Sequence, residues 1–201
     1  MRRIQMGLTY LTRNFWRFML VLGLNFAAFN ILFALEGRFE SLAGVPTFDT
    51  QNDLTTETLL QQLPLYAGEA RTAYFQFAAF DFVFPFVAAF FLAVLWTLLL
   101  RINGWPFAAS LLRWNFPLLA FAGTLFDWLE NISLLALLNS GSAPGETLLN
   151  AAILFKQLKL TVLTASVGIT VVLLVLTAAY WLLRVVRSSR GRQDAQTAKG
   201  I

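Results

Sequence analysis

Cysteine and histidine are both absent from the 201 residues of this chain. Without them the chain forms no disulfide, and it lacks the groups needed for the usual thiolate and imidazole zinc sites, Ser–His–Asp triads and cysteine nucleophiles. Charged residues are scarce as well, at 13% of the chain against about a quarter in an ordinary soluble domain. The sequence therefore excludes several common kinds of active site and is not typical of a soluble domain.

Apolar residues make up most of the chain: 58% of it is hydrophobic, with 20 Phe and 6 Trp. A bilayer core about 30 Å thick is crossed by a helix of about 20 apolar residues, and the chain contains four such runs. We therefore predict an all-α integral membrane protein, a bundle of four transmembrane helices with spans at residues of about 15–36, 74–100, 115–138 and 158–184.

The basic residues indicate how these spans are oriented. With both termini in the cytoplasm, 11 of the 15 Lys and Arg residues lie on cytoplasmic segments, and those outside are Arg38, Arg71, Lys156 and Lys159. This asymmetry is the positive-inside pattern of multi-pass proteins. It predicts a plasma-membrane or inner-membrane location with both termini cytoplasmic. Cations at the ends of apolar runs also indicate the lipid bilayer, rather than nucleic acid, as the partner.

The four spans and their connections are predicted to form one domain followed by a tail. Residues 1–187 are predicted to form one four-helix membrane domain, and residues 188–201 a disordered basic cytoplasmic tail. The outer loop at 37–72 is too long for a simple turn. It contains DLTTETLLQQL at 53–63, where Asp53 or a following Thr would cap a short helix.

The third span contains polar residues that are costly in a membrane. LFDWLENISLL, at 125–135, contains Asp127, Glu130 and Asn131. At 100° per residue these three share a face with small residues, and bulky apolar residues occupy the opposite face. Since acids are disfavoured next to lipid and small residues allow close packing, we expect this face to point into the bundle.

Counting along the helices brings further polar residues to the same depth. At about 1.5 Å per residue, Asp81 of the second span and Asn30 of the first span reach the layer of the three polar residues, between the midplane and the outer surface. Lys156 and Lys159 lie just above it and are candidate counter-ions. We predict a polar pocket of Asp81, Asp127, Glu130, Asn131 and Asn30.

Pro85 adds a predicted kink beside Asp81. A proline has no N–H, so the carbonyl four residues earlier, that of Asp81, loses its helical partner. A freed carbonyl beside a carboxylate is a common element of cation and proton sites. The alternative is that Pro85 only bends the helix and a neighbouring Thr or Asn satisfies the carbonyl.

Three classes of function remain open. The first is a binding or transport-related protein whose pocket, open to the outer side, takes a proton, a cation or a cationic amphiphile. The second is an intramembrane enzyme that holds Mg²⁺ through carboxylates and acts on a lipid. The third is an assembly subunit in which the acids serve only to hold the helices together by hydrogen bonds. Four helices are few for a transporter acting alone, so transport would require a homodimer or a membrane partner.

The enzyme class is the weaker of the first two. The motif Asp127-x-x-Glu130-Asn131 is shorter than the aspartate-rich motifs of intramembrane prenyltransferases, and ceramidase-like membrane hydrolases need histidine ligands. A hard cation also takes more oxygen ligands than this motif supplies. We therefore expect no cofactor, with Mg²⁺ required only under the enzyme alternative, and place a binding or partner role first.

Overall fold

The structure is a computed structural model that describes residues 2–141 and 144–197, with side chains described as far as residue 187. Its described part contains helices and connecting loops, and no strand. The helices are α1 (Arg2–Leu11), α2 (Phe15–Ala43), α3 (Thr56–Gln62), α4 (Gly68–Asp81), α5 (Phe84–Ile102), α6 (Pro106–Arg113), α7 (Ala122–Asn139) and α8 (Glu146–Thr197), with 3₁₀ turns η1 (Leu63–Leu65) and η2 (Phe116–Phe121).

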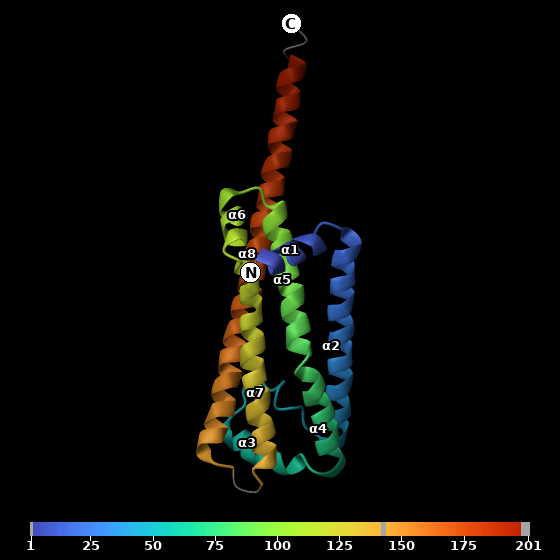
Figure 1. The fold of residues 1–201 in the computed structure, drawn as a ribbon, viewed down its shortest axis with the longest axis vertical. Coiled ribbons are helices and arrows are strands. Elements are labelled where there is room, and N and C mark those ends of the chain that lie inside the picture. Colours follow the sequence, from blue (N-terminus) through green and yellow to red (C-terminus); the bar gives the residue numbers. More distant parts are fainter. Residues whose placement is uncertain (1, 142–143, 198–201) are drawn as a thin grey trace.

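Four segments are long and apolar enough to cross a membrane: Phe15–Ala43, Gly68–Ile102, Phe116–Asn139 and Glu146–Arg187. They form an elongated bundle in which α7 packs along α8, and α2 packs against α4 and α5 (Figure 1). We call the end that carries α3 and residues 44–67 the loop end, and the opposite end the α1 end. Helices α1 and α6 lie at the α1 end, and α8 runs past it.

The first span is longer than predicted. The Asn14 side chain caps α2 by accepting from the Trp16 N–H at 2.8 Å. The helix ends where Gly44 adopts φ +72, a left-handed conformation that suits glycine. Because α2 continues to Ala43 and α4 begins at Gly68, both helices extend into the predicted loop at 37–72. The short helix predicted within that loop is present as α3, capped by Thr55.

The second span is broken rather than only kinked. Helix α4 ends at Asp81 and α5 begins at Phe84, with Pro85 in its first turn. Two carbonyls at the break bond to α7: Phe82 O accepts from Trp128 Nε1 at 2.8 Å, and Pro85 O accepts from Thr124 Oγ1 at 3.0 Å. Side chains of α7 thus stabilise a break in the helix at the place where Pro85 predicts a kink.

The third and fourth spans differ from the predicted boundaries. The third begins as the 3₁₀ turn η2, which has Pro117 near its start, before it becomes α7. The fourth begins as early as Glu146 and remains one helix through Thr197. The backbone of residues 188–197 is therefore helical where the sequence predicts a disordered tail, and residues 198–201 lie outside the described part.

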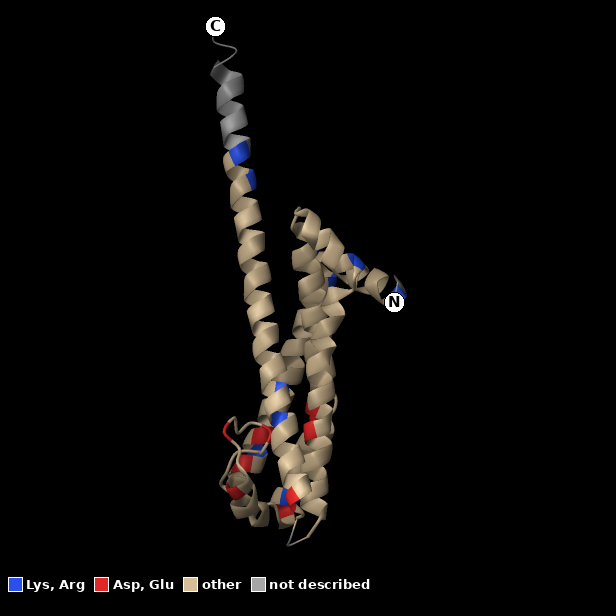
Figure 2. Ribbon diagram, turned by 90° about the vertical axis from the view of Figure 1, so that its left-hand side faces the viewer, with Lys and Arg blue, Asp and Glu red and all other residues tan. Residues whose placement is uncertain are grey.

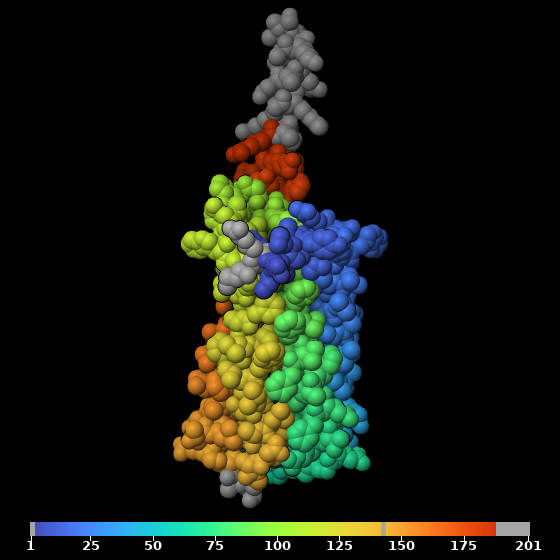
Figure 3. All heavy atoms as spheres, in the orientation of Figure 1, coloured from blue at the N-terminus to red at the C-terminus, as the bar shows by residue number. Residues whose placement is uncertain are grey.

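The predicted inner face of the third span is confirmed. Asp127, Glu130 and Asn131 are all buried, whereas Leu125, Trp128 and Ile132 on the opposite face are exposed. On the face of the molecule in Figure 3, α7 lies beside α4. Arg71 of α4 joins the two helices by donating to Leu138 O at 3.1 Å and to the Asn139 side chain at 2.9 Å.

Large apolar side chains cover much of the outside of the bundle, as a lipid-facing surface requires. Phe26 and Phe33 of α2 are each 68% exposed, and Val167 and Val175 of α8 are exposed to a similar extent. Charged residues are largely confined to the two ends, apart from a few inside (Figure 2). The acidic residues of Figure 2 lie toward the loop end, and most of the basic ones toward the α1 end.

Aromatic and aliphatic residues fill the inside near both ends. At the loop end, Phe39, Phe48, Tyr66 and Tyr74 pack ring against ring. Nearer the α1 end, Trp96 of α5 is 1% exposed, stacks on Phe116 and donates from Nε1 to Thr170 Oγ1 at 2.8 Å. The polar residues of α7 lie between these two apolar regions.

Candidate functional site

The acidic motif of α7 meets two lysines of α8. Glu130 is 0% exposed and Lys156 is 2% exposed, and Lys159 and Asp127 are also buried. Lys159 Nζ lies 2.9 Å from Asp127 Oδ1 and 2.6 Å from Glu130 Oε2. Lys156 Nζ lies 3.2 Å from Glu130 Oε1. The structure thus brings the two candidate counter-ions into contact with the acids as ion-pair partners.

Lys156 also holds the loop between α2 and α3. Its ammonium group donates to Phe48 O at 2.8 Å and to Asp49 O at 2.9 Å, in addition to Glu130. These three contacts use all three N–H donors of the group. Lys156 is therefore fully satisfied and joins α7, α8 and the loop in one place.

Asp81 reaches the site through Asn131. Asn131 Nδ2 donates to Asp81 Oδ2 at 3.0 Å and lies 3.4 Å from Asp127 Oδ2, so one amide connects two carboxylates from different helices. Asp81 is 4% exposed. Within the described residues no ammonium or guanidinium group lies within ion-pair distance of Asp81, which distinguishes it from Asp127 and Glu130.

Asp49 belongs to the site although the sequence does not predict it. It lies on the loop after α2, is 8% exposed, and accepts at Oδ2 from the Tyr74 hydroxyl at 3.0 Å. Its Oδ1 is buried and has no hydrogen-bond partner among the described residues. Asp49 lies on a loop, so no helical periodicity predicts which way its side chain points. The only indication in the sequence is the excess of acidic residues in the loop at 37–72.

Asn30, by contrast, is not brought to the other polar residues. Its side chain is exposed on α2, and its Nδ2 donates to Phe26 O of its own helix at 2.7 Å. An Asn can satisfy its amide in this way by bonding one turn back along the helix. Depth along the helix places Asn30 at the right level, but its helical phase turns it away from the other polar residues.

We use the term carboxylate cluster for the four acids and their partners, Asp49, Asp81, Asp127, Glu130, Asn131, Lys156 and Lys159. Four carboxylates and two ammonium groups would leave two unbalanced negative charges if every group were ionised. Unbalanced charge is costly in a poorly solvated site. Protons or a positively charged ligand must therefore supply the balance, and the two acids without a lysine partner are Asp49 and Asp81.

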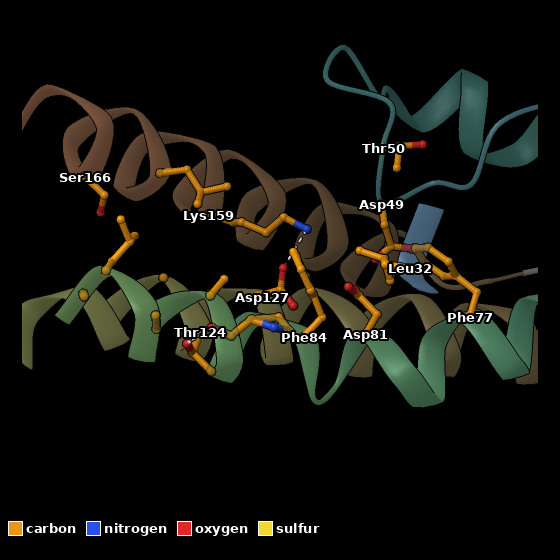
Figure 4. Close-up of a pocket in the computed structure, with 17 residues that line it drawn as sticks. Leu32, Asp49, Thr50, Phe77, Asp81, Phe84, Thr124, Asp127, Lys159 and Ser166 are labelled. Carbon is orange, nitrogen blue, oxygen red and sulfur yellow. Dashed lines mark hydrogen bonds and ion pairs between the residues drawn. The ribbon is translucent and has the colours of Figure 1, made fainter. Parts of the chain in front are cut away.

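A cavity of about 180 Å³ lies against this part of the cluster. Figure 4 shows Asp49, Asp81, Asp127 and Lys159 gathered along it, with the dashed ion pair joining Lys159 to Asp127. Its other walls are mostly apolar, among them Leu32, Phe77, Ala88, Ala89, Leu92, Ala120, Gly123 and Leu163. Glu130, Asn131 and Lys156 do not line it. The cavity-facing part of the cluster therefore contains one ion pair, Asp127 with Lys159, and two carboxylates without a lysine partner, Asp49 and Asp81.

The pKa of Asp49 is shifted, and this carboxyl lies outside the four apolar spans. Burial, followed by the negative charge of Glu130, raises the pKa of Asp49 from 3.8 to about 6. The charged and titratable groups that surround it are Glu130 and Asp127 on α7, Lys156 and Lys159 on α8, Tyr66 before α4, and Tyr74 and Asp81 on α4.

The raised pKa of Asp49 predicts a pH-dependent stability. Because the folded state holds this proton more tightly than the unfolded state, the stabilisation is complete below pH 3.8 and is lost as pH rises through about 6. The loss is on the order of 3 kcal/mol at about 1.4 kcal/mol per pKa unit. Denaturation in detergent across this pH range should show a smaller loss in Asp49→Asn than in wild type. Asp53→Asn, an exposed control in the same loop, should behave as wild type. Equal slopes in wild type and Asp49→Asn would contradict the shift.

Among the side chains that the structure describes, no group of three or more acidic residues is placed to hold a metal ion. Lys159 lies between Asp127 and Glu130, and Lys156 pairs with the other oxygen of Glu130. Comparisons of the chain with protein-family models, with curated proteins and with solved structures find no match. The chemistry of the site is accordingly inferred from its own geometry.

Proposed function

We propose that this protein is a binding or transport-related membrane protein that takes a positively charged species, a proton or a cation, into the cavity beside Asp49 and Asp81. The observation that carries the proposal is the pair of buried carboxylates without a lysine partner that face this cavity. In the proposed orientation both termini are cytoplasmic, so the loop end lies outside and the positive species arrives from the outer side.

The acids with a lysine partner and those without one have different roles in this proposal. Glu130 is paired with Lys156 and Lys159, and Lys156 also donates to two backbone carbonyls, so these residues act mainly to hold α7, α8 and the loop together. Asp81 has one amide donor, and Asp49 has one hydroxyl donor and one oxygen without a partner. Incomplete satisfaction of buried carboxylates is what a site for a positive ligand requires.

Asp81→Asn is the sharpest test of the proposed function. Asparagine keeps the shape and can still bond to Asn131, so the bundle should remain folded while the charge disappears. We expect wild-type protein in lipid nanodiscs to take up a proton or to bind ethylammonium or Na⁺, and we expect Asp81→Asn to lose about tenfold or more in affinity. Potentiometric titration and calorimetry would measure these quantities.

Asp53→Asn provides the matched control, because it removes the same charge from an exposed loop position. It should bind as wild type does. If folded Asp81→Asn and wild type take up protons and bind both probes equally well, the proposed function is wrong. The carboxylate cluster would then serve only to hold the helices together.

A further inference from the structure

The cavity is larger than a proton or a small dehydrated ion needs. Its volume is about 180 Å³, whereas one water molecule accounts for about 30 Å³ of liquid. A hard divalent cation would instead require about six oxygen ligands in a compact shell. Beyond its carboxylates the lining offers the hydroxyls of Thr50, Thr124 and Ser166, which lie on three different segments and donate to backbone carbonyls, so they form no compact shell.

The charged groups of the cavity lie at its loop end, and towards the α1 end the lining is apolar except for the hydroxyls of Thr124 and Ser166, which donate to backbone carbonyls. The lining runs from Asp127 of α7 to Ala120 of η2, and along α8 from Lys159 to Ser166. The seven steps along each stretch cover about 10 Å. On α5 the wall continues through Ala88 to Leu92, away from Asp81. The shape therefore suits a molecule with a charged head and an apolar tail, aligned with the helices.

The sign of the head follows from the charges around it. Lys159 is the one basic residue among the residues that line the cavity, and Asp127 and Glu130 already neutralise it. Asp49 Oδ1 and Asp81 remain as acceptors without a cationic partner. An ammonium group has three donors that carboxylates and carbonyls can receive. The protein already holds its own two lysine ammonium groups with such acceptors in the same cluster.

We propose that the ligand is an aliphatic primary amine in its protonated form, with its ammonium group between Asp49 and Asp81 and its tail along Ala88 and Ala120. This proposal rests on the proposed function, because it specifies which positive species the same cavity takes. It assigns charge recognition to the carboxylates of the loop and α4, and tail recognition to the small residues of α5 and η2.

The test compares probes that differ in one respect each. Wild-type protein in nanodiscs would be titrated calorimetrically with hexylammonium, ethylammonium, hexanol and hexanoate, and protein-free nanodiscs would correct for partition into lipid. Since each buried methylene contributes about 0.8 kcal/mol, hexylammonium should bind about tenfold or more tightly than ethylammonium. It should also bind more tightly than hexanol and hexanoate, which have the tail without the positive charge.

Cavity-filling variants separate the tail from the head. Ala88→Val and Ala88→Leu should weaken hexylammonium binding progressively, by about tenfold for leucine, and leave ethylammonium binding unchanged. Ala79→Leu, at an exposed position of α4, is the control and should have no effect. The valine variant keeps the test valid if leucine prevents folding.

The possible outcomes distinguish the two proposals. If Asp81→Asn abolishes proton or ethylammonium binding but hexylammonium shows no advantage, the amine proposal is overturned and the proposed function remains. If hexanoate binds best, the sign of the head is wrong and both proposals fall. If Ala88→Leu weakens both amines equally, the tail does not lie along Ala88 and the amine proposal is overturned.

Discussion

Replacement of Glu130 with glutamine is expected to lower the free energy of unfolding by about 3–5 kcal/mol. Glu130 is fully buried and contacts both Lys156 and Lys159. Glutamine keeps the size of the side chain, so the main change is that two buried ammonium groups share one fewer negative charge. Removal of one partner from a buried ion pair is costly because the remaining charge stays desolvated.

Unfolding by denaturant in mixed micelles would measure the effect of Glu130→Gln. Glu40→Gln is the matched control: Glu40 is exposed in the last turn of α2, and its replacement should change stability by about 0.5 kcal/mol or less. If Glu130→Gln unfolds at the same denaturant concentration as wild type, Glu130 does not stabilise the contact between α7 and α8.

The second large effect is expected at Trp96. Trp96→Ala should cost about 3–5 kcal/mol, because it removes a fully buried ring and leaves a cavity between α5 and its neighbours. The substitution also removes the donor to Thr170, which lies on α8. Both losses weaken the association of the second and fourth spans, where α5 contacts α8.

Trp114→Ala offers the same chemical change at a position that is 84% exposed. It should change the unfolding free energy by about 0.5 kcal/mol or less. Thermal unfolding followed by tryptophan fluorescence would compare the two variants. Equal stability of Trp96→Ala and Trp114→Ala would mean that the α1 end of the bundle is not packed as described.

The sequence predicts most of the helical framework because its signals are local. The length of apolar runs predicts the four spans, and Pro85 predicts the position of the break between α4 and α5. Helical phase predicts that Asp127, Glu130 and Asn131 face inward, since residues on one helix keep fixed angles to one another. Lys156 and Lys159 are three residues apart, so they also share a face.

The remainder of the site depends on contacts between distant segments. Asp49 lies on a loop whose path is determined by Lys156 and Tyr74, which bind its backbone and side chain from α8 and α4. Neither contact leaves a periodic signal near residue 49. For Asn30 the sequence predicts the depth along the helix but not the direction of the side chain. That direction depends on the rotation of α2 about its own axis, which is determined by packing against α4 and α5.

The contacts of Lys156 and Lys159 have a consequence for the order in which the chain enters the membrane. Until α8 is in place, the acids of α7 have no ammonium partner, and each charged acid near the centre of a span costs about 2.5–3.5 kcal/mol. Lys156 follows Glu130 by 26 residues, but it lies 108 residues after Phe48. We therefore predict that α7 and α8 insert best as a hairpin, and that the loop before α3 takes its final position only after that hairpin is complete.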